Sequence, residues 1–193
     1  MLNLKDLSVA IQSVEILRGV NLNLPQGRMA GLIGRNGAGK TTLLRSIMGH
    51  LPYQSGSVTF DQVDLATTPA HRRNHLGVGY MPEDRRLVPE LSVEENVLLP
   101  LWATSKKNSA TKLKQVYAMI PEVEQFRDRK ALQLSGGQQK LVALARSLMS
   151  GTKLLLLDEP FEGVAPALAQ RLVEVIAGLK REGLTVLLSE SDL

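Results

Sequence analysis

Cysteine is absent from this chain of 193 residues, and histidine occurs only three times. Without thiol groups the chain forms no disulfide bond and offers no thiolate ligand to a metal ion. His50, His71 and His75 lack the spacing of a metal site, so we expect them on the surface.

Long apolar runs are absent as well. No stretch approaches the ~20 apolar residues that are needed to cross a bilayer. Met1–Asp6 carries charges where a signal peptide would be apolar. We therefore expect a cytoplasmic chain, in which any membrane role comes through a partner.

Charge of one sign is in only small excess, with a net charge of +4 and a pI near 9.5, and the basic residues are dispersed. This distribution gives no reason to expect a direct nucleic-acid partner. The chain is 44% hydrophobic and 22% charged, a balance typical of globular proteins. Its length fits a single domain spanning residues 1–193.

The periodicity of apolar residues predicts alternating strands and helices. Alternation of apolar and polar side chains predicts strands at 2–9 and 16–24. Short apolar runs predict further strands at 29–33, 58–65, 76–81, 154–157 and 184–188. Helical spacing predicts helices at 42–48 and 166–180, and a mostly helical stretch at 92–149. This order is typical of an α/β fold with a mostly parallel sheet.

A glycine-rich loop lies between the predicted strand at 29–33 and the helix that follows it. It matches the phosphate-binding pattern G-x-x-x-x-G-K-[ST] in full. Its residues and the next position are Gly34, Arg35, Asn36, Gly37, Ala38, Gly39, Lys40, Thr41 and Thr42. Glycines let backbone N–H groups converge on phosphates, the lysine reaches the outer phosphates, and the threonine hydroxyl can hold Mg²⁺. A chance glycine turn is the alternative, but it would not require a strand before the loop and a helix after it.

Two carboxylates follow the apolar run Leu154–Leu157. Asp158 and Glu159 therefore stand at the carboxyl end of a buried strand, where α/β sheets bind their ligands. We expect Asp158 to serve Mg²⁺ and Glu159 to orient or deprotonate water. An acidic pair at this position is otherwise only a solvated loop or a helix cap.

A second small-residue loop, Ser135, Gly136, Gly137 and Gln138, precedes a helix with apolar residues at helical spacing. A hydroxyl group and two glycines at a helix N-terminus form an anion cradle. A flexible helix cap is an equally acceptable interpretation from physical reasoning alone.

The order of these three segments along the chain resembles that of the ABC ATPase family. The resemblance implies an ATP hydrolase that uses ATP and Mg²⁺, built on a P-loop core with an N-terminal antiparallel β part and a helical signature subdomain. It also implies a head-to-tail pair with a second ABC ATPase domain, either identical or different. Ser135, Gly136, Gly137 and Gln138 would then contact the nucleotide bound on the partner.

Three further segments, 80–86, 92–96 and 162–166, resemble the ATPases of branched-chain amino acid, urea and amide importers. That subgroup carries a glutamate, here Glu83, where most of the family has the glutamine that contacts Mg²⁺ and the attacking water. The resemblance implies a catalytic and metal-binding role for Glu83. It also implies transmembrane permease subunits that dock near residues 83–95, with the chain on the inner face of the cell membrane.

Two positions depart from the family pattern. Ile11 stands where the family stacks an aromatic ring on adenine, so we expect weaker or less selective base binding. Ser191 stands where a histidine contacts the γ-phosphate, and near the end of the chain we expect it to be poorly fixed. The chain stops at Leu193, before the C-terminal segment typical of the family, so the domain is expected to be C-terminally short.

Two functions from different classes follow. The first is the motor of an importer, with a nucleotide-binding core at 1–82 and 151–193 and the signature subdomain at 83–150. The second, prompted by Ile11 and Ser191, is a regulatory switch that binds ATP and hardly hydrolyses it. A DNA-repair or chromosome ATPase is disfavoured, because the stretch between Lys40 and Ser135 has no room for a long coiled coil.

Overall fold

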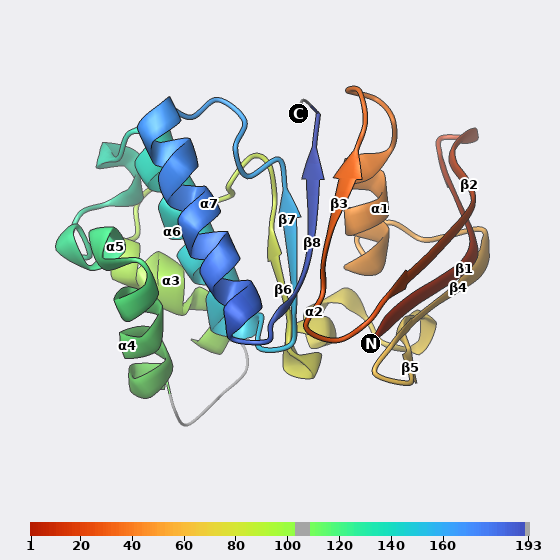
Figure 1. Ribbon diagram of the computed structural model, residues 1–193, viewed down its shortest axis with the longest axis horizontal. Helices are drawn as coiled ribbons and strands as arrows, with labels where there is room; N and C mark the ends of the chain where they lie inside the picture. Colours follow the sequence, from red (N-terminus) through yellow and green to blue (C-terminus); the bar gives the residue numbers. More distant parts are fainter. Residues whose placement is uncertain (103–108, 192–193) are drawn as a thin grey trace.

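The computed structural model describes residues 1–102 and 109–191, within which the strands form two four-stranded sheets. Residues 103–108, part of the predicted helical stretch, lie outside the described residues. Figure 1 shows the parallel sheet in the middle of the molecule, the antiparallel sheet on one side of it and most of the helices on the other. None of the helices in the described ranges is both long enough and apolar enough to span a membrane.

The antiparallel sheet has the order β2-β1-β4-β5. Its strands are β1 (Leu2–Ile11), β2 (Val14–Leu24), β4 (Ser55–Phe60) and β5 (Val63–Asp64). Leu2 and Leu4 of β1 are at most 1% exposed, as the alternating pattern predicts. Leu7 is also buried, because a register shift between Leu4 and Leu7, where Asp6 has a positive φ of 47°, interrupts the alternation. The prediction of one strand at 58–65 is wrong, because Asp61 and Gln62 both have positive φ (47° and 68°) and form the turn of a hairpin.

The parallel sheet has the order β3-β8-β7-β6. Its strands are β3 (Met29–Ile33), β6 (Val78–Met81), β7 (Leu154–Asp158) and β8 (Thr185–Glu190). Leucines of β7 point alternately to two sides: Leu154 and Leu156 join the core against the antiparallel sheet, and Leu155 and Leu157 join the core against the helices. All four are 0% exposed, which explains why an unbroken apolar run encodes this strand.

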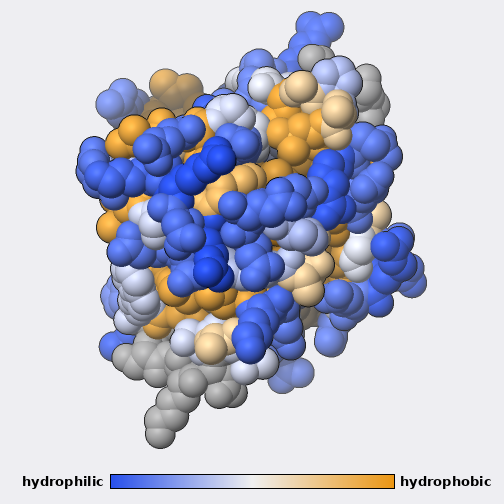
Figure 2. All heavy atoms as spheres, turned by 90° about the vertical axis from the view of Figure 1, so that its left-hand side faces the viewer, coloured by the Kyte–Doolittle hydropathy of each residue, from blue (hydrophilic) through white to orange (hydrophobic). Residues whose placement is uncertain are grey.

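The helices flank the parallel sheet on both faces (Figure 1). They are α1 (Lys40–Ile47), α2 (Ala70–Arg73), α3 (Val93–Trp102), α4 (Ser109–Met119), α5 (Pro121–Gln125), α6 (Gly136–Ser150) and α7 (Pro166–Arg181), with 3-10 turns at Leu65–Thr67, Asn74–Leu76 and Ala131–Gln133. Helix α1 packs between the two sheets, and α3 to α7 cover the other face. Figure 2 looks onto this helical side, where hydrophilic residues predominate and hydrophobic residues show between them. The predicted α/β class is confirmed.

All three histidines are exposed, as expected. Arg73, in contrast, is a charged side chain that is only 4% exposed. Its guanidinium donates to the carbonyl oxygens of Ser46 and Ile47 at the end of α1, and to those of Leu65 and Thr68, at 2.5–3.2 Å. Because a planar guanidinium has five donors, it reaches all four carbonyls, of which Ser46 O and Leu65 O also accept a backbone N–H.

We expect Arg73→Met to lower the free energy of unfolding by about 3 kcal/mol, because buried carbonyl oxygens lose their donor. Denaturant unfolding of the two proteins measures this difference. Arg72→Met, at the exposed neighbouring position, is the control and should change stability by less than ~0.5 kcal/mol. Equal effects of the two substitutions would contradict the anchoring role of Arg73.

Candidate functional site

The glycine-rich loop joins the carboxyl end of β3 to the first turn of α1. Gly39 immediately precedes the helix with φ of 95°, and a side chain there would approach Leu17 Cδ2 to 2.8 Å. Glycine is therefore required at this position by both conformation and space. The unpaired N–H groups at the start of α1 face the loop, which is the arrangement that binds phosphate groups.

Lys40 lies folded back across this loop. Its Nζ atom donates to Gly34 O at 2.6 Å and to Arg35 O at 3.3 Å, and lies 3.1 Å from Glu159 Oε1. The side chains of the ion pair are only 8% and 6% exposed. Each charge is therefore largely removed from water and depends on the other for compensation.

Asp158 is completely buried at the end of β7. Its Oδ1 atom accepts hydrogen bonds from Thr41 Oγ1 at 3.0 Å and Ser189 Oγ at 2.7 Å, and Oδ2 accepts one from Tyr80 OH at 3.2 Å. Neighbouring strands supply Tyr80 and Ser189, and α1 supplies Thr41. The parallel sheet thus holds Asp158 in one orientation beside the glycine-rich loop.

Glu159 is only 4% exposed and has a positive φ of 47°, which is unfavourable for a residue with a side chain. Ser189 Oγ accepts from its backbone N–H at 3.1 Å, and Lys140 Nζ donates to its carbonyl oxygen at 2.6 Å. Its Oε2 atom accepts bonds from Ser191 N at 3.0 Å and Ser191 Oγ at 3.1 Å. These contacts fix the carboxylate at the mouth of the loop.

Ser191 is therefore better fixed than we expected from its place near the end of the chain. The parallel register pairs Asp158 with Ser189 across β7 and β8, which brings the residue two positions later beside Glu159. The side chain contacts the carboxylate rather than standing free. A catalytic role for Ser191 stays a prediction.

A cleft of about 420 Å³ opens beside the loop. Its walls combine loop residues, one apolar side chain and three carboxylates: Ile16, Asn36, Gly37, Gly39, Lys40, Thr41, Thr42, Glu83, Glu159 and Glu162. Six of the predicted nucleotide contacts thus share one cavity, together with Glu83 and Glu159. Its volume suits a small-molecule ligand.

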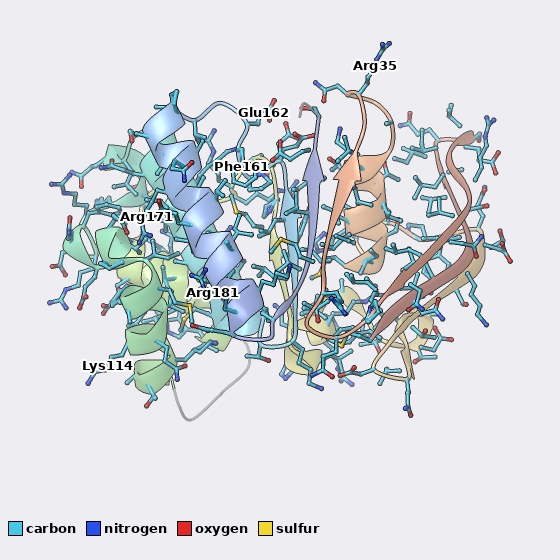
Figure 3. All side chains as sticks on the ribbon, viewed as in Figure 1. Arg35, Lys114, Phe161, Glu162, Arg171 and Arg181 are labelled. Carbon is cyan, nitrogen blue, oxygen red and sulfur yellow. The ribbon has the colours of Figure 1, made fainter. Side chains whose placement is uncertain are left out.

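Three of the other predicted contacts belong to the same loop but are not among the described residues that line the cleft. Gly34 and Arg35 contribute carbonyl oxygens to Lys40, and Ala38 completes the turn through its N–H bond to Arg35 O at 3.1 Å. Figure 3 shows Arg35 pointing away from the molecule. Ile11 ends β1 with 38% of its surface exposed and is not among the described residues that line the cleft.

Glu83 follows β6 and faces the other carboxylates of the cleft. Partial burial and the negative charges of Glu162 and Asp158 raise the pKa of Glu83 above its ordinary value. Glu162 comes from the segment after β7, and in Figure 3 it lies beside the carboxyl end of β8. The neighbouring carboxylates therefore make Glu83 harder to ionise.

The second small-residue loop lies apart from the cleft. Ser135 caps α6: its Oγ accepts from Gln138 N at 3.3 Å, and its N–H donates to Gln138 Oε1 at 3.0 Å. Neither these two residues nor Gly136 and Gly137 are among the described residues that line the cleft. The cap leaves the start of α6 at the surface, where a ligand from outside the chain can reach it.

Sequence reasoning assigned no role to Ser189, Tyr80, Ile16, Lys140 or Glu162. Ser189 and Tyr80 lie on strands that flank β7, so the rule that parallel strands share a carboxyl end could have indicated them. Lys140 gave no such signal, because its partner is a backbone carbonyl 19 residues away.

Comparisons with known proteins agree with this geometry. Residues 17–162 match the family model described as ABC transporter. The chain is 35% identical over 192 residues to the high-affinity branched-chain amino acid transport ATP-binding protein BraG of Pseudomonas aeruginosa, covering 100% of this chain and 82% of the relative. It is 32% identical over 194 residues to the lipopolysaccharide export system ATP-binding protein LptB of Escherichia coli, covering 100% and 80%.

A solved structure with the same fold is the dimeric post-hydrolysis state of an ATP-binding cassette bound to ADP and Pi. It superposes with a TM-score of 0.88 at 26% identity, covering 100% of this chain and 88% of that one. The family match extends over most of the chain and includes the glycine-rich loop, the second small-residue loop and the two carboxylates at the end of β7, Asp158 and Glu159. The chain therefore belongs to the ABC transporter family, as one of its ATP-hydrolysing cassettes.

Proposed function

We propose that this chain drives a membrane importer of amino acids or related small polar solutes by binding and hydrolysing MgATP. The observation that carries the proposal is the convergence of Lys40, Thr41, Asp158 and Glu159 beside one cleft. The similarity to BraG, a branched-chain amino acid transport protein, supports amino acids as the solute, whereas the similarity to LptB makes export the alternative direction.

Phosphate binding follows from the loop. N–H groups at the start of α1 and the ammonium of Lys40 supply positive charge and donors to the β- and γ-phosphates. Lys40 is paired with Glu159, so ATP would exchange one anionic partner of the ammonium for another. The exchange would free the Glu159 carboxylate to face the attacking water.

Mg²⁺ would be held by Thr41 and Asp158. Their oxygen atoms lie 3.0 Å apart, and oxygen donors are the ligands that this ion prefers. The described residues contain no ready group of three acidic or histidine ligands, which suits an ion that is completed by water and phosphate oxygens. Glu83 would stand next to the ion. When bound, Mg²⁺ supplies charge neutralisation of the phosphates.

Glu159 would act as the general base. A water oxygen attacks the γ-phosphorus, the bond to the ADP oxygen breaks, and Glu159 takes up a proton from the water. The two hydrogen bonds from Ser191 to Oε2 leave Oε1 for this task once Lys40 has turned to the phosphates.

The start of α6 supports pairing with a second cassette. Ser135, Gly136, Gly137 and Gln138 would contact the nucleotide on the partner, either another copy or a different cassette. The dimeric state of the solved ADP and Pi complex supports this arrangement. ATP binding would close the pair, and hydrolysis would reopen it.

Permease subunits would dock at residues 83–95, on the inner face of the cell membrane. This segment starts at Glu83 in the cleft and ends in the first turn of α3. Arg146 of α6 donates to the carbonyl oxygens of Arg85 and Arg86, so the segment is tied to the helical part. The division into a core at 1–82 and 151–193 and a subdomain at 83–150 stays a proposal.

Removing the chain from the cells that produce it tests the direction of transport. Uptake of radiolabelled branched-chain amino acids should fall, and a copy carrying Glu159→Gln should fail to restore it. Unchanged uptake together with impaired lipopolysaccharide export would replace the importer by the exporter.

Lys40→Ala should weaken MgATP binding about 10- to 100-fold, because the phosphates lose a charge-assisted donor. Titration with a fluorescent ATP analogue measures the loss. Lys153→Ala is the matched control, because Lys153 pairs with Asp61 through an exposed contact of 2.8 Å outside the cleft. Parental affinity in Lys40→Ala would contradict the role of the loop.

Glu159→Gln should retain ATP binding and lose turnover at least about 100-fold, because an amide is not a base. Phosphate release at saturating MgATP gives the rate, and size-exclusion chromatography should show an ATP-stabilised dimer. Hydrolysis at the parental rate would assign the base to another residue.

The hydrolysis rates of Ser191 variants distinguish the importer motor from the regulatory switch. The parent should turn over slowly, and Ser191→His should raise the single-turnover rate about tenfold by placing a donor beside the developing charge. Ser191→Ala is the control for loss of the bond to Glu159 and should not raise the rate. A fast parent that the histidine leaves unchanged would remove the support for the switch.

A further inference from the structure

Lys140 is a buried cation that has no role in the ATP hydrolysis proposed above. Only 4% of the residue is exposed, and its Nζ atom donates to the carbonyl oxygen of Glu159 at 2.6 Å. A hydrogen bond from a charged donor away from water is stronger than one between neutral groups. The bond joins α6 directly to the backbone of the residue proposed as the base.

The direction of the Glu159 carboxylate depends on this backbone. The residue has a positive φ of 47°, a conformation that persists only where the surroundings enforce it. Ser189 Oγ lies 3.1 Å from its N–H on one side, and Lys140 holds its carbonyl on the other. A shift of the ammonium would rotate the peptide group after Glu159 and re-aim the side chain.

Helix α6 connects this bond to the second small-residue loop. Ser135 caps the helix, and Lys140 follows five residues later, a rise of about 7.5 Å along the axis. The reciprocal bonds between Ser135 and Gln138 make the first turn rigid. A displacement of Ser135 would therefore be transmitted to Lys140 through less than two turns of helix.

A second contact ties the same helix to the segment after Glu159. A side chain at Gly137 would approach Leu168 Cδ2 to 2.2 Å, so the start of α6 packs closely against the first turns of α7. Helix α7 begins at Pro166, directly after the segment that Glu159 opens. Helix α6 thus holds both ends of that segment, through Lys140 and through Gly137.

We propose that Lys140 is a positioning residue that links a nucleotide held at Ser135 in one site to the orientation of Glu159 in the other site. The proposal rests on the proposed function, because it needs two cassettes that share their nucleotides. Each cassette would contribute α6 to one site and Glu159 to the other. Occupation of one site then alters hydrolysis in the second, and the effect is reciprocal for binding.

The test compares Lys140→Met, Lys140→Arg and Ser147→Ala in the full chain. Lys140→Met removes the donor and should lower kcat about 100-fold while the KM for ATP stays within about threefold. The Hill coefficient of Lys140→Met for ATP should be one, whereas that of the parent protein should be above one. Lys140→Arg keeps a donor and should restore cooperativity. Ser147, buried on the same helix and bonded to Leu144 O at 2.7 Å, is the matched control that should leave both quantities unchanged.

The Hill coefficient separates this role from a merely structural one. A general loss of structure would lower the melting temperature and the active fraction and leave the cooperativity of the remaining protein intact. If Lys140→Met does not fold, Lys140→Gln decides, because its shorter neutral side chain should likewise abolish cooperativity. Parental kcat and parental cooperativity in the folded variant would overturn the proposal.

MgATP hydrolysis by the parent protein distinguishes a failure of the proposed ATPase function from a failure of the proposed role of Lys140. A parent that hydrolyses MgATP with a Hill coefficient of one supports the ATPase and overturns the role of Lys140. A parent that hydrolyses no MgATP overturns both. A cooperative parent and a non-cooperative Lys140→Met variant that Lys140→Arg rescues support both.

Discussion

The buried ion pair between Lys40 and Glu159 is the interaction on which the rest of the site depends. A carboxylate at the end of a fully buried strand is costly unless a cation and hydrogen-bond donors compensate it. Lys40 supplies the cation from α1, and Ser191, directly after β8, donates two hydrogen bonds to the carboxylate. Ser189 of β8 accepts from the backbone N–H of Glu159. The parallel sheet therefore has to bring the ends of three strands and the start of one helix to the same place.

Local patterns in the sequence were sufficient for much of this structure. The run Leu154–Leu157 predicted a strand buried on both faces, and the glycine-rich loop predicted the turn into α1. Each signal is short-range, because it reflects one strand or one turn. The hairpin at Asp61 and Gln62 was missed because neither residue is a glycine, although both adopt the positive φ of such turns.

Contacts between distant segments could not be predicted in this way. Lys140 and Ser191 reach Glu159 only after the sheet and α6 are assembled, and neither residue stands in a pattern that names its partner. Ser191 illustrates the point: its position suggested a loosely held end, whereas the register of β7 and β8 places it against a carboxylate. Sequence patterns therefore indicated the chemistry of the site better than its internal connections.

The burial of the Lys40 side chain has a consequence for how the cleft responds to ionic strength. Charges that are exposed on a surface are screened by salt within about 10 Å at 0.1 M, whereas buried charges are screened far less. The side chains of Lys40 and Glu159 are 8% and 6% exposed, so the proposed exchange of a carboxylate for a phosphate would take place beneath the reach of most counterions. The cleft would select its ligand by the fit of anions around one ammonium, with little dependence on the salt of the surrounding solution.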